Sequence, residues 1–155
     1  MNKTAIFPGS FDPITMGHFD IINRALCLFD NIVVGVGVNS AKQSLYSLER
    51  RMDWIGKVFE HEPKVSVETY EGLTVDFCNK IGAKFILRGL RTSADFEYER
   101  VIAQMNRSMY GEIETVFILS APELLAVNST IVREIIKNGG EASKFVPAGI
   151  DLSLD

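Results

Sequence analysis

The chain has 155 residues, enough for one domain of ordinary size with a closed core. Hydrophobic residues make up 46% of the chain and charged residues 23%, close to the averages of globular proteins, which excludes a disordered chain. The 16 Lys and Arg against 20 Asp and Glu give a net charge of −4, so there is no chain-wide basic surface for nucleic acid or anionic lipid. Any anion site must be built from a few local residues.

Cysteine and histidine content limits the chemistry further. Cys27 and Cys78 are too few for a disulfide framework, and we expect both to be buried reduced thiols because they lie in apolar helical patterns. With two scattered histidines they offer no metal-ligand spacing, so we expect no metal held by the protein itself. No signal peptide is evident, and no apolar run approaches the ~20 residues of a membrane span. We expect a cytoplasmic protein that does not contact membranes.

The first half of the chain alternates between strand-like and helix-like patterns. A short buried strand is predicted at Lys3–Phe7, followed by a loop rich in Pro and Gly at Pro8–Gly17. Apolar residues at helical spacing then predict a helix at His18–Phe29. The Val-rich run Asn31–Val38 is typical of an interior parallel strand. Ser47 can cap a helix that runs through Trp54 to Glu60.

The same alternation continues to the end. A strand is predicted at Val65–Tyr70, and Thr74 can cap a helix at Val75–Ile81 that ends in a left-handed Gly82. The remaining expected elements are a strand at Phe85–Leu87, a helix at Ala94–Asn106, a strand at Thr115–Leu119, and a helix that starts at Asn128 or Ser129 and stops at Gly139-Gly140. Strand and helix alternate five times. This predicts a single α/β domain over residues 1–155, with a doubly wound five-stranded parallel sheet.

Ligands bind to such sheets outside the carboxyl ends of the strands. The loop after the first strand reads Pro-Gly-Ser-Phe-Asp-Pro-Ile-Thr-Met-Gly-His and ends at His18. Gly9 and Gly17 allow the backbone to approach a ligand closely, and the free N–H groups of the following helix suit a phosphate chain. His18 would stand in the first helical turn beside such a phosphate. We interpret this loop as an anion site rather than a plain capped loop.

Three other strand-to-helix loops add polar residues at the same edge. Lys42 follows the second strand, Arg88-Gly89-Leu90-Arg91 follows the fourth, and Asn128-Ser129-Thr130 follows the fifth. Arginines grip phosphates by paired hydrogen bonds, and hydroxyls with free N–H groups at a helix start make an anion site. Read alone, each has a plain alternative: a solvated charge, a surface ion pair or an ordinary helix cap. Together they predict a polyanion site.

Several other nucleotide and nucleophile motifs are missing. There is no Gly-x-x-x-x-Gly-Lys-Ser/Thr, which excludes a P-loop. Gly35-Val36-Gly37 lies inside a strand without the third glycine of a dinucleotide fingerprint. No Ser or Cys has a His and an acid at positions suited to a nucleophile.

The first loop resembles the opening motif of the nucleotidylyltransferase superfamily, and Asn-Ser-Thr-Ile-Val-Arg at 128–133 resembles its second phosphate motif. Within the superfamily, Arg88-Gly89-Leu90-Arg91 followed by Asp95-Phe96-Glu97-Tyr98-Glu99 and Met105-Asn106-Arg107 resembles the bacterial phosphopantetheine adenylyltransferase family. The similarity covers the whole chain. Ser10 stands where the family often has Thr, and Asn128 interrupts its usual Ser-rich run. The resemblance implies a Rossmann-like nucleotidylyltransferase fold and conversion of ATP and 4′-phosphopantetheine to dephospho-coenzyme A and pyrophosphate.

The resemblance also implies roles for individual residues. Catalytic roles fall to His18, Lys42 and Arg91, and acceptor binding to Ser10, Lys42, Thr74 and Arg88. ATP would be bound by Ser10, Phe11, His18, Gly89, Leu90, Arg91, Glu99, Leu124, Leu125, Ala126, Val127, Asn128, Ser129 and Thr130. Mg²⁺ would accompany the triphosphate. A homohexamer and feedback binding of coenzyme A are further implications of the family.

Two alternatives remain at this point. An adenylyltransferase for nicotinate mononucleotide, or a cytidylyltransferase, would share the first and last motifs and lack the Arg-Gly-Leu-Arg element. Outside enzymes, the chain could be an ATP-binding regulatory module without turnover. The acceptor residues Lys42, Thr74 and Arg88 are all present, which favours the enzyme.

Overall fold

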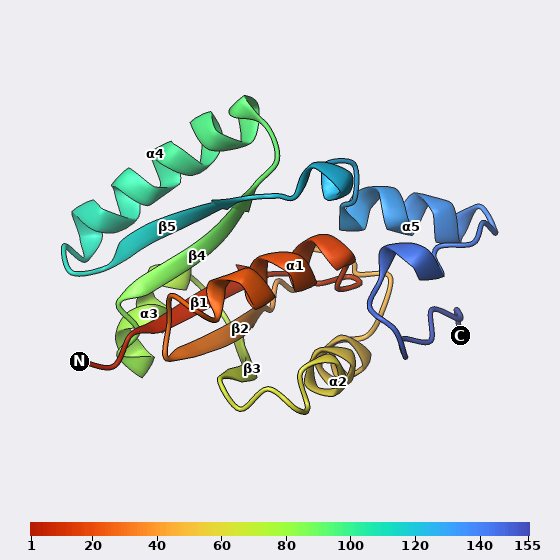
Figure 1. Cartoon of the computed structure of the whole chain (residues 1–155), viewed down its shortest axis with the longest axis horizontal. Coiled ribbons are helices and arrows are strands. Elements are labelled where there is room, and N and C mark those ends of the chain that lie inside the picture. Colours follow the sequence, from red (N-terminus) through yellow and green to blue (C-terminus); the bar gives the residue numbers. More distant parts are fainter.

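The computed structural model describes residues 1–155, and its five strands form one parallel sheet (Figure 1). The strands are β1 (Thr4–Gly9), β2 (Asn31–Gly37), β3 (Val65–Tyr70), β4 (Phe85–Leu90) and β5 (Glu114–Leu119). Their order in the sheet is β3-β2-β1-β4-β5, and every neighbouring pair is parallel. The direction of winding therefore reverses between β1 and β4. The prediction of a doubly wound, five-stranded parallel sheet is confirmed.

Five α-helices and two short 3₁₀ turns connect and follow the strands. The helices are α1 (Met16–Ala25), α2 (Leu48–Val58), α3 (Thr74–Ile81), α4 (Ser93–Met109) and α5 (Ser129–Lys137), with 3₁₀ turns η1 (Pro122–Leu124) and η2 (Ser143–Phe145). None of the helices combines the length and the hydropathy needed to cross a bilayer. In Figure 1 the carboxyl ends of the strands point to the right, toward η1 and α5.

The first helix is shifted from its predicted bounds. It begins at Met16 because Thr15 caps it, and it stops at Ala25, where a turn closes with the Leu28 N–H bonded to the Ala25 carbonyl. Cys27 lies in this turn and is exposed, so the expectation that both thiols are buried is wrong for Cys27. Cys78 is buried as predicted, and burial raises the pKa of its thiol to about 12.

Two other predicted boundaries differ. Thr74 does not cap α3: Leu73 holds the cap position without a side-chain bond, and the Thr74 hydroxyl instead pairs with that of Tyr70 at 2.7 Å. The fourth strand does not stop at Leu87, because its ladder with β5 continues to Leu90 opposite Leu119. Arg88 is thus part of a strand and not of the loop after it. The polar Arg-Gly pair interrupts the apolar run that marked this strand in the sequence.

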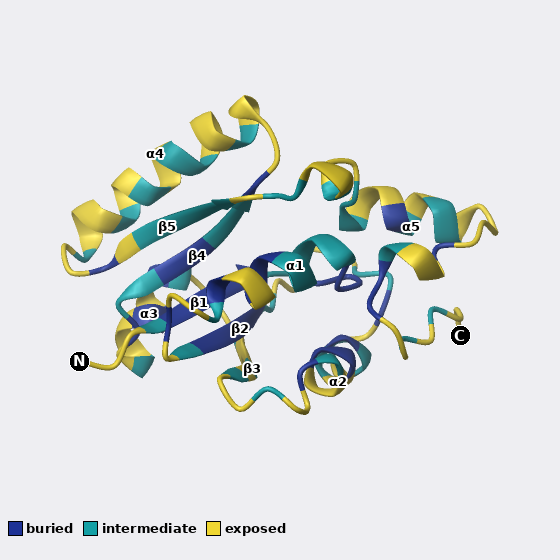
Figure 2. Cartoon of the chain, in the orientation of Figure 1, coloured by how far each residue is buried: buried dark blue, intermediate teal, exposed yellow.

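Burial is concentrated on the inner strands, with helices on both faces of the sheet (Figure 2). On one face, the side chains of α1 and α2 pack against Ala5, Phe7, Ile32, Val34, Val36 and Leu87. On the other face, Val75, Phe77 and Cys78 of α3 pack against Ile6, Val33 and Ile86. Neighbouring strand residues alternate between the two clusters, as the two-residue period of a strand requires.

The sheet opens between its two central strands. β1 pairs with β2 over its whole length, from Thr4 to Gly9. Its pairing with β4 is limited to Ala5 with Phe85 and Ile6 with Ile86. Beyond these pairs the carboxyl-terminal halves of β1 and β4 are not bonded to each other. This is the reversal point of the winding, where sheets of this kind bind ligands.

Gly82 and Gly56 provide a matched test of the backbone. Gly82 ends α3 with φ 71°, whereas Gly56 lies within α2, and a methyl group at either position meets nothing within 4 Å. Gly82→Ala should lower the free energy of unfolding by about 1 kcal/mol, because a left-handed residue with a β-carbon is strained. Gly56→Ala should raise it by about 0.5 kcal/mol, because alanine favours the helix. Urea unfolding of both variants measures these shifts, and equal shifts would contradict this interpretation.

Candidate active site

Two clefts meet at the opening between β1 and β4. The first has a volume of about 420 Å³ and the second about 200 Å³, and both are lined by Pro8, Gly9 and Arg88. Thr74 of α3 and Ile102 of α4 also line the first cleft, and Ile21 of α1 lines the second. Since α1 and α3 cover opposite faces of the sheet, the clefts lie on opposite sides of its carboxyl edge. Two ligands bound there would meet at Gly9 and Arg88.

The first cleft brings together the four residues expected to bind the acceptor. Ser10, Lys42, Thr74 and Arg88 come from four different segments of the chain, and all four line this cleft. The Lys42 ammonium donates to the Ser10 hydroxyl at 3.3 Å. A cation and two hydroxyl groups are thus gathered with a guanidinium, which suits a phosphate group.

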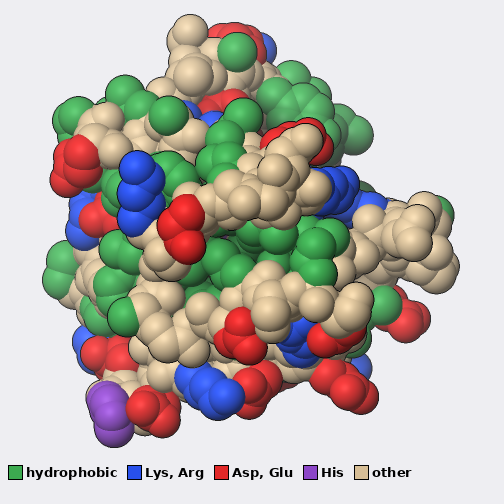
Figure 3. Space-filling view, turned by 90° about the vertical axis from the view of Figure 1, so that its right-hand side faces the viewer, with side chains coloured by type: hydrophobic (Ala, Val, Ile, Leu, Met, Phe, Trp, Pro, Cys, Tyr) green, Lys and Arg blue, Asp and Glu red, His purple; other side chains and the backbone are tan.

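The second cleft contains five of the residues expected to bind ATP: His18, Gly89, Arg91, Val127 and Asn128. Asn128 also caps α5, accepting the Ile131 N–H at 3.0 Å. The exposed Arg91 stands 3.7 Å from the Asp95 carboxylate. Acidic, basic and apolar groups are interspersed on the face that includes this edge, and no uniformly basic surface is seen there (Figure 3).

His18 is held by a reciprocal cap at the start of α1. Its Nδ1 accepts the Thr15 N–H at 3.0 Å, and the Thr15 hydroxyl in turn accepts the His18 N–H at 3.4 Å. Nδ1 therefore carries no proton, and the neutral ring is protonated at Nε2, which has no partner within the chain. Burial, together with the nearby charges of Arg88 and Arg91, lowers the pKa of His18 to about 4. At neutral pH His18 is an uncharged donor facing the second cleft.

Arg88 is oriented by a carboxylate and a carbonyl. Its Nε and Nη2 donate to the two oxygens of Glu99 at 3.0 and 2.6 Å, and its Nη1 donates to the Pro8 carbonyl at 2.9 Å. These bonds leave further N–H groups of the guanidinium free for a ligand. Glu99, expected at the ATP site, lies instead in the wall of the first cleft. Its carboxylate forms an ion pair with Arg88.

Ser10, also expected at the ATP site, lines the first cleft, and the remaining expected ATP residues line neither cleft. Phe11 is buried beneath His18, with ring centroids 4.9 Å apart, and Leu90 is buried in β4. The Ser129 hydroxyl donates to the Pro13 carbonyl. Leu124, Leu125, Ala126 and Thr130 lie in η1, the turn after it and the start of α5.

Sequence reasoning missed the contribution of α4. Tyr98, Ile102, Ala103 and Asn106 line the first cleft, together with Tyr70 from the end of β3. Their spacing of three and four residues marks one face of a helix, but the direction of that face depends on how α4 packs against β4 and β5. No group of three or more His, Cys, Asp or Glu side chains is placed to hold a metal ion.

The low pKa of His18 can be tested by its titration. We expect an NMR midpoint near pH 4 in the free protein, and a higher midpoint with ATP, because phosphate charges favour the protonated ring. Between pH 6.5 and 4, His18 is protonated in the unfolded chain and mostly neutral in the folded protein. Because the unfolded chain binds the extra proton, the free energy of unfolding should fall by about 3 kcal/mol over this range. His18→Asn should remove that part of the pH dependence. A midpoint near 6.5 in the free protein would contradict the described burial.

Comparisons with known proteins identify the family and the fold of the chain. The cytidylyltransferase-like family model matches residues 6–135. A phosphopantetheine adenylyltransferase from Flavobacterium psychrophilum is 53% identical over 148 residues, covering 96% of this chain and 97% of that protein. One from Bacteroides fragilis is 44% identical over 150 residues, covering 97% and 99%.

Solved structures share the fold at low sequence identity. A bifunctional NMN adenylyltransferase/ADP-ribose pyrophosphatase from Francisella tularensis, complexed with AMP and a manganese ion, aligns with a TM-score of 0.69 at 18% identity. The alignment covers 99% of this chain and 46% of that one, which confirms the nucleotidylyltransferase fold. The sequence identity of 44–53% to relatives, over nearly the full length of the chain, is the more specific finding. On that ground the chain belongs to the phosphopantetheine adenylyltransferase family, within the cytidylyltransferase-like proteins.

Proposed function

We propose that this protein transfers the adenylyl group of ATP to 4′-phosphopantetheine, giving dephospho-coenzyme A and pyrophosphate in the biosynthesis of coenzyme A. Membership of the family supports the reaction. The structural observation that carries it is the pair of clefts on opposite sides of the sheet edge, which share Pro8, Gly9 and Arg88. A transferase for two phosphorylated substrates needs this arrangement, because the two reacting phosphates must meet.

The acceptor phosphate is assigned to the first cleft. Lys42 and Arg88 supply positive charge there, and Ser10 and Thr74 supply hydroxyl groups. The same cleft is also lined by Tyr98, Ile102 and Asn106, a mixture of polar and apolar groups that suits a pantetheine arm. Arg88 stands where this cleft meets the second one, so it can hold the acceptor phosphate beside the α-phosphate of ATP.

The nucleotide phosphates are assigned to the second cleft. His18 donates a hydrogen bond from Nε2 without bringing a charge, and Arg91 supplies a charge at the exposed rim. Backbone N–H groups at the start of α1 and of α5 can stabilise the negative charge of a bound phosphate. The stretch Leu124–Thr130 would contact the nucleoside. Two residues of this stretch, Val127 and Asn128, line the second cleft.

The reaction needs no general base from the protein. A phosphate monoester has a second pKa of about 6 and is mostly dianionic at neutral pH, so its oxygen can attack directly. A bond forms between this oxygen and the α-phosphorus, while the bond to the leaving pyrophosphate breaks in line. Positioning by Lys42 and Arg88, and charge stabilisation by His18, Lys42 and Arg91, then account for catalysis.

Mg²⁺ enters this proposal as part of the nucleotide substrate. No protein cluster of three ligating side chains is available, and Mg²⁺ characteristically binds through phosphate oxygens and water. A protein of the same fold, whose structure contains AMP and a manganese ion, supports a divalent cation at the phosphates.

A homohexameric, cytoplasmic enzyme with one catalytic domain and feedback binding of coenzyme A completes the proposal. Support for assembly comes from α4, which contains no buried residue (Figure 2). Tyr98, Val101 and Met105 on this helix are exposed by 70%, 51% and 59%. A second subunit covering this helix would remove that apolar surface from water. Coenzyme A contains the phosphopantetheine arm, so it fits the acceptor cleft.

His18→Ala tests the assigned role of the histidine. We expect turnover to fall about 10²- to 10³-fold, with the dissociation constant of ATP changed only slightly, because the Nε2 hydrogen bond acts mainly in the transition state. His61→Ala is the matched control, since His61 is fully exposed in the loop before β3 and far from both clefts. Unchanged turnover in His18→Ala would remove His18 from the mechanism.

The reaction itself is tested by pyrophosphate release from ATP and Mg²⁺ with either 4′-phosphopantetheine or nicotinate mononucleotide as acceptor. We expect release with phosphopantetheine only. Release with the mononucleotide alone would identify a different acceptor. ATP binding without release for either acceptor would indicate the non-catalytic module.

A further inference from the structure

The turn after β1 is held tightly on both sides of a strained residue. Phe11 has φ 49°, a left-handed conformation that is unfavourable for a residue with a side chain. The carbonyl before it, of Ser10, accepts the Arg51 guanidinium at 2.7 Å, and the carbonyl after it, of Asp12, accepts Arg133 at 2.9 Å. Arg51 comes from α2 and Arg133 from α5. The main chain of this turn is therefore fixed independently of the Asp12 side chain.

The Asp12 side chain connects this turn to another loop. Its carboxylate is 3% exposed, and its two oxygens accept the N–H groups of Leu45 at 2.8 Å and of Tyr46 at 2.9 Å. Arg51 reinforces the connection by donating to the Tyr46 carbonyl at 3.1 Å. Burial lowers the pKa of Arg51, and the charge of Asp12 opposes that shift. Asp12 lines neither cleft, so its contacts are entirely within the protein.

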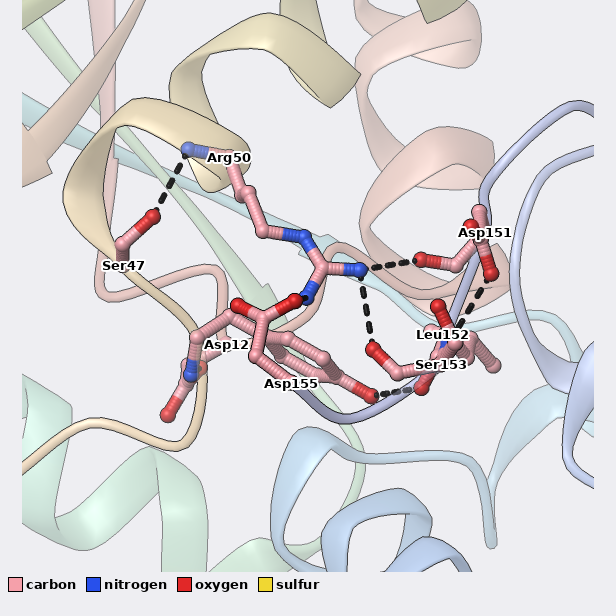
Figure 4. A network of polar contacts seen from close by, with 8 residues as sticks. Asp12, Ser47, Arg50, Asp151, Leu152, Ser153 and Asp155 are labelled. Atoms are coloured by element: carbon pink, nitrogen blue, oxygen red, sulfur yellow. Dashed lines mark hydrogen bonds and ion pairs between the residues drawn. The ribbon is translucent and has the colours of Figure 1, made fainter.

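Tyr46 is also fixed from the opposite side by the C-terminal segment. Its hydroxyl donates to the Leu152 carbonyl at 2.7 Å, and the Arg50 guanidinium lies 5.0 Å from its ring centroid. Arg50 donates to the carbonyls of Asp151 and Ser153, as Figure 4 shows. The end of the loop that contains Lys42 is thereby anchored between Asp12 and the last residues of the chain.

The main chain of Lys42 is held on its N-terminal side by Asn39, whose carbonyl accepts the Lys42 N–H at 3.1 Å. Lys42 is exposed, and its ammonium has one partner, the Ser10 hydroxyl at 3.3 Å. Leu45 follows it by three residues, so the hydrogen bonds of Asp12 are the nearest fixed point on its C-terminal side. Ser10 and Asp12 belong to the same turn. On its C-terminal side, the bonds of Asp12 to Leu45 and Tyr46 therefore limit how far Lys42 stands from Ser10.

We propose that Asp12 is a positioning residue that places Lys42 in the acceptor cleft. This inference rests on the proposed function, because it assigns Lys42 to the acceptor phosphate. Both carboxylate oxygens of Asp12 accept a backbone N–H, one from Leu45 and one from Tyr46. In asparagine one of these oxygens is replaced by an NH₂ group, which would face one of the two backbone N–H groups as a second donor. The Lys42 loop would then move away from the turn. The turn keeps its bonds to Arg51 and Arg133, so the ATP side is preserved.

Asp12→Asn separates this role from general destabilisation. We expect kcat/KM for phosphopantetheine to fall about 10- to 100-fold, since a displacement of about 1 Å is enough for such a loss. The dissociation constant of ATP should change less than about twofold. Asp30→Asn is the matched control, because Asp30 also accepts a backbone N–H, that of Lys3 at 2.8 Å, at the far edge of the sheet. Equal weakening toward both substrates would overturn the proposal.

A double-mutant cycle with Lys42→Ala tests whether the effect passes through Lys42. In the Lys42→Ala background, Asp12→Asn should lower kcat/KM for phosphopantetheine less than about threefold, because the group it positions is gone. The same loss in both backgrounds would show that Asp12 acts elsewhere. If Asp12→Asn does not fold, Asp12→Glu replaces it, since the longer stem displaces Leu45 and Tyr46 while keeping charge and acceptors.

The unmodified protein distinguishes failure of this inference from failure of the proposed function. If it releases no pyrophosphate with phosphopantetheine, the proposed function fails and the inference fails with it. If it is active and Asp12→Asn is as active toward phosphopantetheine, the inference alone fails.

Discussion

The bonding between β1 and β4 ends at Ile6 and Ile86, and the rest of the site depends on this early end. Backbone polar groups beyond that point need other partners, because unpaired groups inside a protein are costly. Pro8 has no N–H to satisfy, and its carbonyl accepts a hydrogen bond from the Arg88 side chain. The guanidinium of Arg88 thus supplies a side-chain hydrogen bond to β1 where the backbone bonds to β4 have ended. It also lines both clefts. If the hydrogen bonding between β1 and β4 continued past Ile6 and Ile86, the two clefts would no longer meet at Pro8, Gly9 and Arg88.

Acidic groups accompany two of the cations at this opening. Glu99 pairs with Arg88, Asp95 lies beside Arg91, and His18, which is half-buried near both arginines, is uncharged. The cations are thus gathered locally in a protein whose net charge is −4.

The loops around the opening differ in how firmly they are held. Buried charged groups such as Asp12 and Arg51 are expensive to place in the interior, and here each is satisfied by backbone partners from another segment. The side chain of the exposed Lys42 has one hydrogen-bond partner, the Ser10 hydroxyl. The turn is therefore held by more partners than the lysine side chain beside it.

The fold class, the family and the sheet edge where the clefts lie could all be predicted from the sequence. These follow from patterns that are local in the chain: alternation of apolar runs, glycine at Gly82, and the motif that ends at His18. Helix ends were less certain, as Cys27 and Thr74 demonstrate, because a turn or a side-chain partner such as Tyr70 decides them. Contacts between distant segments are decided only by the tertiary structure. These include the pairing of Arg88 with Glu99, the wall of the cleft formed by α4, and the bonds of Asp12 to Leu45 and Tyr46. The physical reason is that each depends on the direction of a side chain in the packed fold, which no local pattern specifies.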